Sequence, residues 1–133
     1  PKKGHCARAI MEAIACIIRR NIDVLEDLKI KVSEIRALGG GARSRLWNQI
    51  KADLTHKPVV TTENEEAACL GAAILAGTAV GMFKSLNEAC KSMVAIKERF
   101  EPNPATFKVY DETYERYVRL YENLCSMFSK EAV

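Results

Sequence analysis

Three consecutive glycines at positions 39–41 separate two segments of different periodicity. Before them, residues 33–38 (SEIRAL) alternate polar and apolar side chains, which is typical of a short strand. After them, residues 44–54 place leucine and isoleucine four positions apart, which predicts a helix. Because glycine adopts backbone conformations that other residues avoid, this stretch predicts a strand, a tight turn and a helix in succession.

The same alternation of helical and extended patterns continues along the chain. Helices are predicted over residues 7–28, 44–54, 85–90 and 110–128, with a further helix between Thr62 and Ala79. Strands are predicted over residues 33–38, 57–61 and 93–100. Neither a repeat nor a low-complexity linker interrupts this order, so we expect residues 1–133 to form a single α/β domain with helices packed on a sheet.

Capping residues mark two of the predicted helix starts. Thr62 followed by Glu65 predicts a capping box for the helix that ends at Ala79. Ser85 predicts the cap of the short helix that follows. The helix between them is rich in alanine and glycine, so we expect it to approach a neighbouring element closely.

Two helices each carry an apolar stripe, which predicts one buried face on each of them. The first stripe is aliphatic and contains Ile10, Ile14, Ile17, Ile18, Leu25 and Leu28. The second lies in the last helix and contains Tyr110, Tyr114, Tyr117, Val118, Tyr121, Leu124, Cys125 and Phe128.

Composition excludes several classes of protein. The 133 residues are 48% hydrophobic and 28% charged, as in globular proteins, and no apolar run is long enough for a membrane span. The net charge of +3 is spread without a basic tract, which argues against nucleic-acid binding. Five cysteines without a CxxC pair argue against zinc and disulfide frameworks, so we expect reduced, mostly buried thiols in a cytoplasmic protein.

The glycine run is the strongest candidate for a binding site. A strand that ends in glycines and leads into a helix recurs at anion and nucleotide sites, because the first N–H groups of the helix are free to donate. Gly39, Gly40 and Gly41 match neither standard phosphate motif, so a turn without a ligand remains an alternative. Ser44 is either a helix cap or a contact to a bound base. Arg43 and its neighbour Arg45 each either contact phosphate or are solvated.

No other group of residues predicts a catalytic or metal site. His5 and His56 lack the spacing of metal ligands, and we expect His56 to lie in a loop. The acidic residues Glu63, Glu65 and Glu66 precede a predicted helix, where they would complement its dipole. We expect Trp47 to pack in the core rather than to stack on a base.

Three segments in order, IRALGGGARSRLWNQIKADL, KPVV and EEAACLGAAILAGTAVG, resemble the C-terminal domain of the FGGY carbohydrate kinases, and xylulokinase-like members above all. The resemblance runs from about His5 to Ala89. His5, Ala9 and Glu12 also resemble the second half of an FGGY signature, although Cys6 stands where that pattern has an aliphatic residue or Phe.

This resemblance implies a fold, a reaction and a site. Kinases of this family phosphorylate a sugar hydroxyl with ATP and Mg²⁺, in a cleft between two actin-like, ribonuclease H-like domains. It implies that Gly39 and Gly40 pass beside the nucleotide phosphates and ribose, that Gly41 relaxes the turn, and that Ser44 lies near the adenine. The helix around Gly71 would support this turn from behind.

The family's other motifs do not occur in the chain. Its catalytic aspartate, its N-terminal phosphate loop and most of its sugar contacts would lie upstream. We therefore expect a fragment that is inactive alone and whose partners are ATP or ADP, a sugar and the N-terminal domain of the same enzyme. Apolar surface exposed in such a fragment would favour a homodimer. The residues alone leave a non-catalytic α/β binding or interaction module as the alternative.

Overall fold

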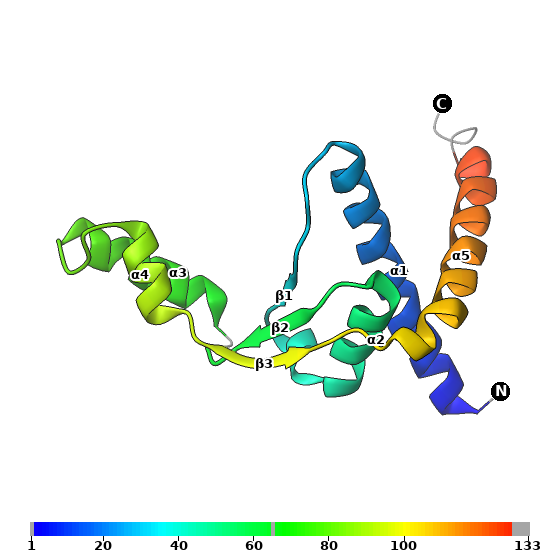
Figure 1. Ribbon diagram of the computed structural model, residues 1–133, viewed down its shortest axis with the longest axis horizontal. Coiled ribbons are helices and arrows are strands. Elements are labelled where there is room, and N and C mark those ends of the chain that lie inside the picture. Colours follow the sequence, from blue (N-terminus) through cyan, green and yellow to red (C-terminus); the bar gives the residue numbers. More distant parts are fainter. Residues whose placement is uncertain (1, 65, 129–133) are drawn as a thin grey trace.

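The computed structural model describes residues 2–64 and 66–128, which form an α/β fold (Figure 1). Its helices are α1 (Lys3–Asp27), α2 (Arg45–Thr55), α3 (Ala67–Ala79), α4 (Leu86–Met93) and α5 (Phe107–Phe128). Its strands are β1 (Ile35–Ala37), β2 (Val59–Thr62) and β3 (Ile96–Phe100), and two 3₁₀ turns are η1 (Gly40–Arg43) and η2 (Pro104–Thr106). The predicted order of helices and strands is confirmed.

The three strands form a mixed sheet in the order β1, β2, β3. Strand β1 runs parallel to β2, with Ile35 opposite Val59, whereas β3 runs antiparallel to β2, with Phe100 opposite Val59. The carboxyl ends of β1 and β2 therefore meet at one edge of the sheet. The glycine turn leaves the sheet from this edge.

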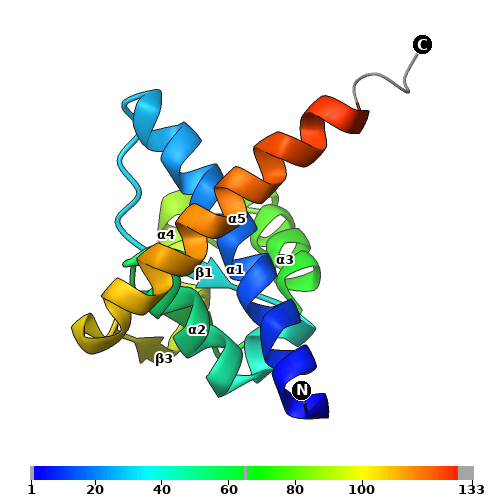
Figure 2. The same ribbon diagram turned by 90° about the vertical axis from the view of Figure 1, so that its right-hand side faces the viewer.

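Helix α2 is the centre of the core. On one side Ile50 and Leu54 pack against α1 and α5, in a cluster with Ala15, Cys16 and Tyr110. On another side Ala52 packs on the sheet in a second cluster, whose strand residues are Ala37, Val59 and Phe100. Figure 2 looks onto α1, α2 and α5, which form the helical layer. We call these three helices and the sheet the α2-centred body.

Helices α3 and α4 lie at the opposite end of the molecule from α1 and α5 (Figure 1). They follow β2 and precede β3, and they pack mainly against each other. Their buried residues are few: Ile74, Gly77 and Ala89. We call α3 and α4 the helix pair.

The predicted buried stripe of α1 is wrong. Ala15, Cys16 and Ile22 face the interior, whereas Ile10 is 64% exposed and Ile17 is 47% exposed. The reason is that α1 also carries apolar residues on a second face, and α2 and α5 pack on the face that contains Met11, Ala15 and Cys16.

The stripe of α5 is buried only along part of its length. Tyr110 is buried, and Tyr114, Tyr117 and Val118 are half-buried. Leu124 is exposed, as are Tyr121 and Cys125 beside it. The predicted contribution of the Phe128 side chain lies outside the described residues. Burial therefore decreases along α5 toward its carboxyl end, where the Arg20 guanidinium of α1 lies over the exposed Tyr121 ring at 3.6 Å.

Ser85 caps α4 as predicted, since its Oγ accepts from the backbone N–H of Glu88 at 3.2 Å. Ser44 is the N-cap of α2, which is one of the two alternatives that the sequence left open for it. The predicted capping box of α3 is wrong. Thr62 is the last residue of β2 and its hydroxyl donates to the carbonyl of Asn64 at 2.9 Å. Helix α3 begins later, after Glu66 as N-cap, and its first turn holds no acidic residue. Glu65 lies outside the described residues.

The expectation that the cysteines are mostly buried is also wrong. Cys16 is buried between α1 and its neighbours, and burial raises the pKa of its thiol to about 11. The remaining four, Cys6, Cys69, Cys90 and Cys125, are exposed and carry free thiols.

Candidate functional site

The glycine turn begins where β1 ends. Gly39 has φ +70°, in the left-handed region that glycine enters without strain, and this reverses the chain direction after the strand. The backbone N–H of Ala42 donates to the Gly39 carbonyl at 3.0 Å, which closes the 3₁₀ turn η1. The turn thus lies between the carboxyl end of β1 and the amino end of α2, where ligands of open α/β sheets bind.

The other two glycines of the turn have different surroundings. At Gly41 a β-carbon would lie 3.1 Å from Cζ3 of Trp47, so a side chain there would displace the Trp47 ring by a few tenths of an ångström. At Gly40 a β-carbon would meet no atom within 4 Å, and its φ lies outside the left-handed region. Neither backbone conformation nor internal packing therefore requires glycine at position 40.

Ser44 and Trp47 connect the turn to the helix that follows. The hydroxyl oxygen of Ser44 accepts from the backbone N–H of Trp47 at 3.3 Å, so Ser44 is the N-cap of α2. The Trp47 side chain is half-buried and its Nε1 donates to the Met11 carbonyl of α1 at 3.2 Å. Trp47 is thus a packing residue, as predicted.

Two polar residues of α2 lie buried behind the turn, and no sequence motif pointed to them. Asn48 is fully buried, and its Nδ2 donates to the Ala42 carbonyl at 2.7 Å. Lys51 is 7% exposed, and its Nζ donates to Oδ1 of Asn48 at 3.3 Å while lying 4.4 Å from the centre of the Trp47 ring. Burial lowers the pKa of Lys51. The signal that the sequence offered for these two buried residues was the spacing of Asn48 and Lys51, three positions apart in an amphipathic helix.

A cavity of about 240 Å³ opens beside the turn. Its lining consists of Ala42, Arg43, Arg45, Thr61, Thr62, Lys97 and Glu98, three of which are cationic. Arg45 pairs with Glu98 at 2.6 Å, and its side chain stays 80% exposed. Three cations, two hydroxyls and one carboxylate, from η1, the start of α2, the carboxyl end of β2 and the amino end of β3, give this cavity a net positive charge that suits an anionic ligand.

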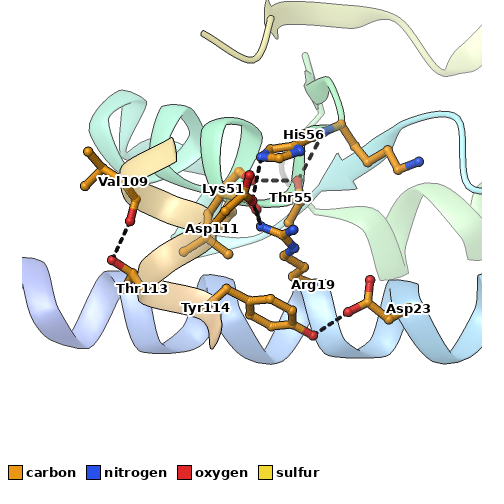
Figure 3. Close-up of polar contacts among 11 residues, drawn as sticks. Arg19, Asp23, Lys51, Thr55, His56, Val109, Asp111, Thr113 and Tyr114 are labelled. Atoms are coloured by element: carbon orange, nitrogen blue, oxygen red, sulfur yellow. Dashed lines mark hydrogen bonds and ion pairs between the residues drawn. The ribbon is translucent and has the colours of Figure 1, made fainter. Parts of the chain in front are cut away.

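His56 lies in the turn that follows α2, in agreement with the expected loop position, and is the C-cap of that helix (Figure 3). Its φ of 56° is left-handed, its ring stacks on Phe107 at 3.9 Å, and its Nε2 lies 3.1 Å from the Asp111 carboxylate. Arg19 donates to the same carboxylate at 2.6 Å and to the Leu54 carbonyl at 3.0 Å. Burial lowers the pKa of His56, although Asp111 opposes the shift. This cluster joins α1, α2 and α5 at the carboxyl end of α2, away from the turn.

Within the described residues, the expected support of the turn by the segment of α3 around Gly71 is not found. Gly71 faces open space, and Gly77 is the glycine of α3 that packs closely, with a β-carbon position 3.0 Å from the Phe83 ring. The side chains that contact the turn, Trp47 and Asn48, come from α2. Support therefore comes from the helix that follows the turn directly.

Within residues 2–64 and 66–128, three or more His, Cys, Asp or Glu side chains nowhere gather as metal ligands would. A search of the same residues finds no helix with both the length and the apolar character to cross a membrane.

Comparison with known proteins identifies a family whose match includes the glycine turn. The C-terminal domain of the FGGY family of carbohydrate kinases matches residues 1–80. Xylulose kinase of Staphylococcus epidermidis is 32% identical over 120 residues, which cover 90% of this chain and 24% of that protein. Autoinducer-2 kinase of Salmonella paratyphi B is 34% identical over 126 residues, which cover 91% of this chain and 23% of that protein.

Solved structures give the same family. The crystal structure of xylulose kinase from Rhodospirillum rubrum superposes with a TM-score of 0.83 at 32% identity, and the match covers 97% of this chain and 26% of that one. The chain thus spans about a quarter of the length of the relatives that it matches. Neighbours of this kind have an actin-like ATPase fold, so the mixed sheet and its helices are part of such a fold. The chain belongs to the FGGY family of carbohydrate kinases and corresponds to their C-terminal domain.

Proposed function

We propose that this chain forms the nucleotide side of the active-site cleft in an ATP-dependent sugar kinase. In this proposal the turn from Gly39 to Gly41 lies along the phosphates and ribose of ATP, and Ser44 lies near the adenine. The family supports the reaction class, and named relatives act on xylulose and autoinducer-2. We propose a pentulose such as xylulose as the sugar, in line with the xylulose kinases among the relatives.

The observation that carries this proposal is the glycine at position 40. A β-carbon there would meet no atom of the protein within 4 Å, so the backbone of Gly40 is open to a ligand that approaches from outside. The adjacent cavity contributes Arg43, Arg45 and Lys97 against one carboxylate, Glu98, and this net positive charge would attract phosphate groups. A nucleotide phosphate on the open side of Gly40 accounts for both features.

The described residues do not by themselves suit Mg²⁺. The cavity beside the turn holds one carboxylate, Glu98, and Arg45 neutralises it at 2.6 Å. Oxygen ligands are what Mg²⁺ requires, so in this proposal they come from the nucleotide phosphates and from the remainder of the kinase. Phosphoryl transfer also needs a group that orients the attacking hydroxyl, and we expect this chain alone to be inactive.

Gly40→Ala tests the proposal. Because the protein has room for the methyl group, we expect the free energy of unfolding to change by less than about 0.5 kcal/mol. We expect affinity for ADP and Mg²⁺ to fall at least about tenfold in the complete kinase that contains this chain, because the methyl group occupies the approach of the phosphates. Isothermal titration calorimetry measures the affinity.

Gly4→Ala provides a matched control, since its β-carbon also meets no atom within 4 Å but lies at the start of α1. We expect this control to bind ADP as the wild type does. Unchanged ADP affinity in Gly40→Ala would contradict the proposal and favour the alternative, a non-catalytic α/β module in which the glycines form a turn and nothing more.

A further inference from the structure

The glycine turn contains little that could hold its own shape. Three consecutive glycines carry no side chains and have the largest backbone freedom of any residues. The backbone bond from Ala42 to Gly39 closes a single 3₁₀ turn. A turn that has to present its backbone to a ligand in one conformation therefore depends on contacts from neighbouring elements.

Those contacts come from two consecutive residues of α2. The Trp47 ring lies against Gly41 on one side of the turn. Asn48 reaches the turn from the interior, and its Nδ2 donates to the Ala42 carbonyl at 2.7 Å. Since Asn48 is fully buried, its Nδ2 would have no solvent partner in place of this bond, and the Ala42 carbonyl would lose the donor if the amide turned over.

Lys51 determines the orientation of the Asn48 side-chain amide. An ammonium can only donate, so Lys51 has to face the amide oxygen, which it does at 3.3 Å. A carbonyl can only accept, so Ala42 has to face the amide nitrogen. The two partners therefore select one orientation of the amide on chemical grounds.

The free energy that it costs to bury the Lys51 ammonium indicates that Lys51 does more than fill space. Lys51 is 7% exposed, and within the described part of the chain no carboxylate forms an ion pair with it. A buried ammonium without a counter-ion is destabilising, whereas an apolar side chain at this position would not be. The Trp47 ring, 4.4 Å from Nζ, offsets part of the cost.

We propose that Asn48 is a positioning residue for the nucleotide-binding turn, that it acts by holding the Ala42 carbonyl, and that Lys51 orients its amide. This inference rests on the proposed function. It assigns a role to residues that lie behind the turn and do not touch the nucleotide.

Asn48→Asp is the variant that tests it. The carboxylate keeps the size of the amide and still accepts from Lys51, but it offers the Ala42 carbonyl a second acceptor in place of a donor. We expect the fold to be retained and the melting temperature to fall by a few degrees, because the loss of the bond to Ala42 is partly offset by the pairing of the carboxylate with Lys51. In this chain we expect the ¹H–¹⁵N heteronuclear NOE to fall at positions 39–44 and to stay unchanged elsewhere.

Kinetics of the complete kinase that contains this chain provide the second readout. We expect the KM for ATP to rise about tenfold, as for the loss of one buried hydrogen bond, while the KM for the sugar stays unchanged. A loss of overall stability would not separate the two KM values. A wild-type NOE profile with a wild-type KM for ATP would overturn the inference.

Lys51→Met and Lys51→Gln form a matched pair that remains informative if Asn48→Asp fails to fold. The two side chains are similar in size, but Gln keeps a donor for the Asn48 oxygen and Met does not. We expect Met to raise the KM for ATP and Gln to restore it. Equal KM values for Met and Gln would overturn the role of Lys51.

The outcomes separate this inference from the proposed function. If Gly40→Ala weakens ADP binding but Asn48→Asp leaves the turn and the KM for ATP unchanged, the nucleotide site stands and the positioning role fails. If Asn48→Asp loosens the turn without changing the KM for ATP, the turn is not a nucleotide site and both proposals fail.

Discussion

The α2-centred body and the helix pair show how differently two parts of one chain use apolar residues. In the body, α2 buries Ile50 and Leu54 against α1 and α5, and Ala52 against the sheet. In the helix pair, α3 (AACLGAAILAGTA) has no charged residue at all, yet Leu75 is 60% exposed. Apolar composition therefore does not predict burial, because burial also needs a partner surface.

This contrast suggests an unequal distribution of stability. The described contacts of α3 are mainly with α4, whereas α2 contacts the sheet and two helices. Regions with few buried apolar contacts open more readily than the core. The following predictions test this comparison, beginning with the largest expected effect.

Leu54→Ala should strongly destabilise the α2-centred body. Leu54 is fully buried between α1, α2 and α5, and we expect its truncation to lower the free energy of unfolding by about 2–5 kcal/mol. Leu75→Ala, the same substitution in α3, should change it by less than about 0.5 kcal/mol because the side chain is exposed. Urea unfolding measures both, and similar losses for the two variants would contradict the comparison.

Gly71→Ala and Gly77→Ala should have different effects on the local stability of α3 in the helix pair. At Gly71 a methyl group meets open space, so we expect α3 to gain up to about 1 kcal/mol of local stability from the better helix former. At Gly77 the methyl group would lie 3.0 Å from Cε2 of Phe83, which offsets that gain. Hydrogen exchange of the α3 amides provides the measurement. Stronger protection in Gly77→Ala than in Gly71→Ala would show that the glycines of α3 have other roles.

His56→Asn should reveal a small pH effect confined to the body. Burial lowers the folded-state pKa of His56 below 6.5, with Arg19 and Lys57 adding to the shift and Asp111 opposing it. The unfolded chain therefore binds more protons below pH 6.5, and stability should fall as the pH decreases through that value. Asn tolerates the left-handed backbone at this position and does not titrate.

The pH effect is read as a difference between two proteins. Urea unfolding at about pH 7.5 and about pH 5.5 should show that the wild type loses more stability than His56→Asn over this interval. An equal loss in both proteins would mean that His56 titrates as an exposed histidine does. The constant offset from the lost Phe107 stacking does not affect this comparison.

Some residues of the candidate site were predictable from their neighbours in the sequence, whereas others depend on contacts with distant elements. Ser44 was predictable as a cap because its partner, the Trp47 amide, lies three residues away. The glycine turn was predictable because three glycines leave few alternatives. Asn48 and Lys51 were not predictable, because their burial depends on the elements that surround α2.

The amino-acid sequence by itself determined the order of the helices and strands, the caps at Ser44 and Ser85 and the place of the turn. These depend on interactions between residues a few positions apart, and such interactions are already present in a short segment of chain. Family membership, carried by three ordered segments, belongs to the same level.

Tertiary structure alone decided which faces are buried. Helix α1 offers two apolar faces, and the choice between them is made by α2 and α5. The bond from Arg19 to Asp111 joins residues 92 positions apart, and His56 meets Phe107 in the same cluster. Contacts over such distances form only when whole elements pack together, because the burial of apolar surface is shared among them and no single segment contains it.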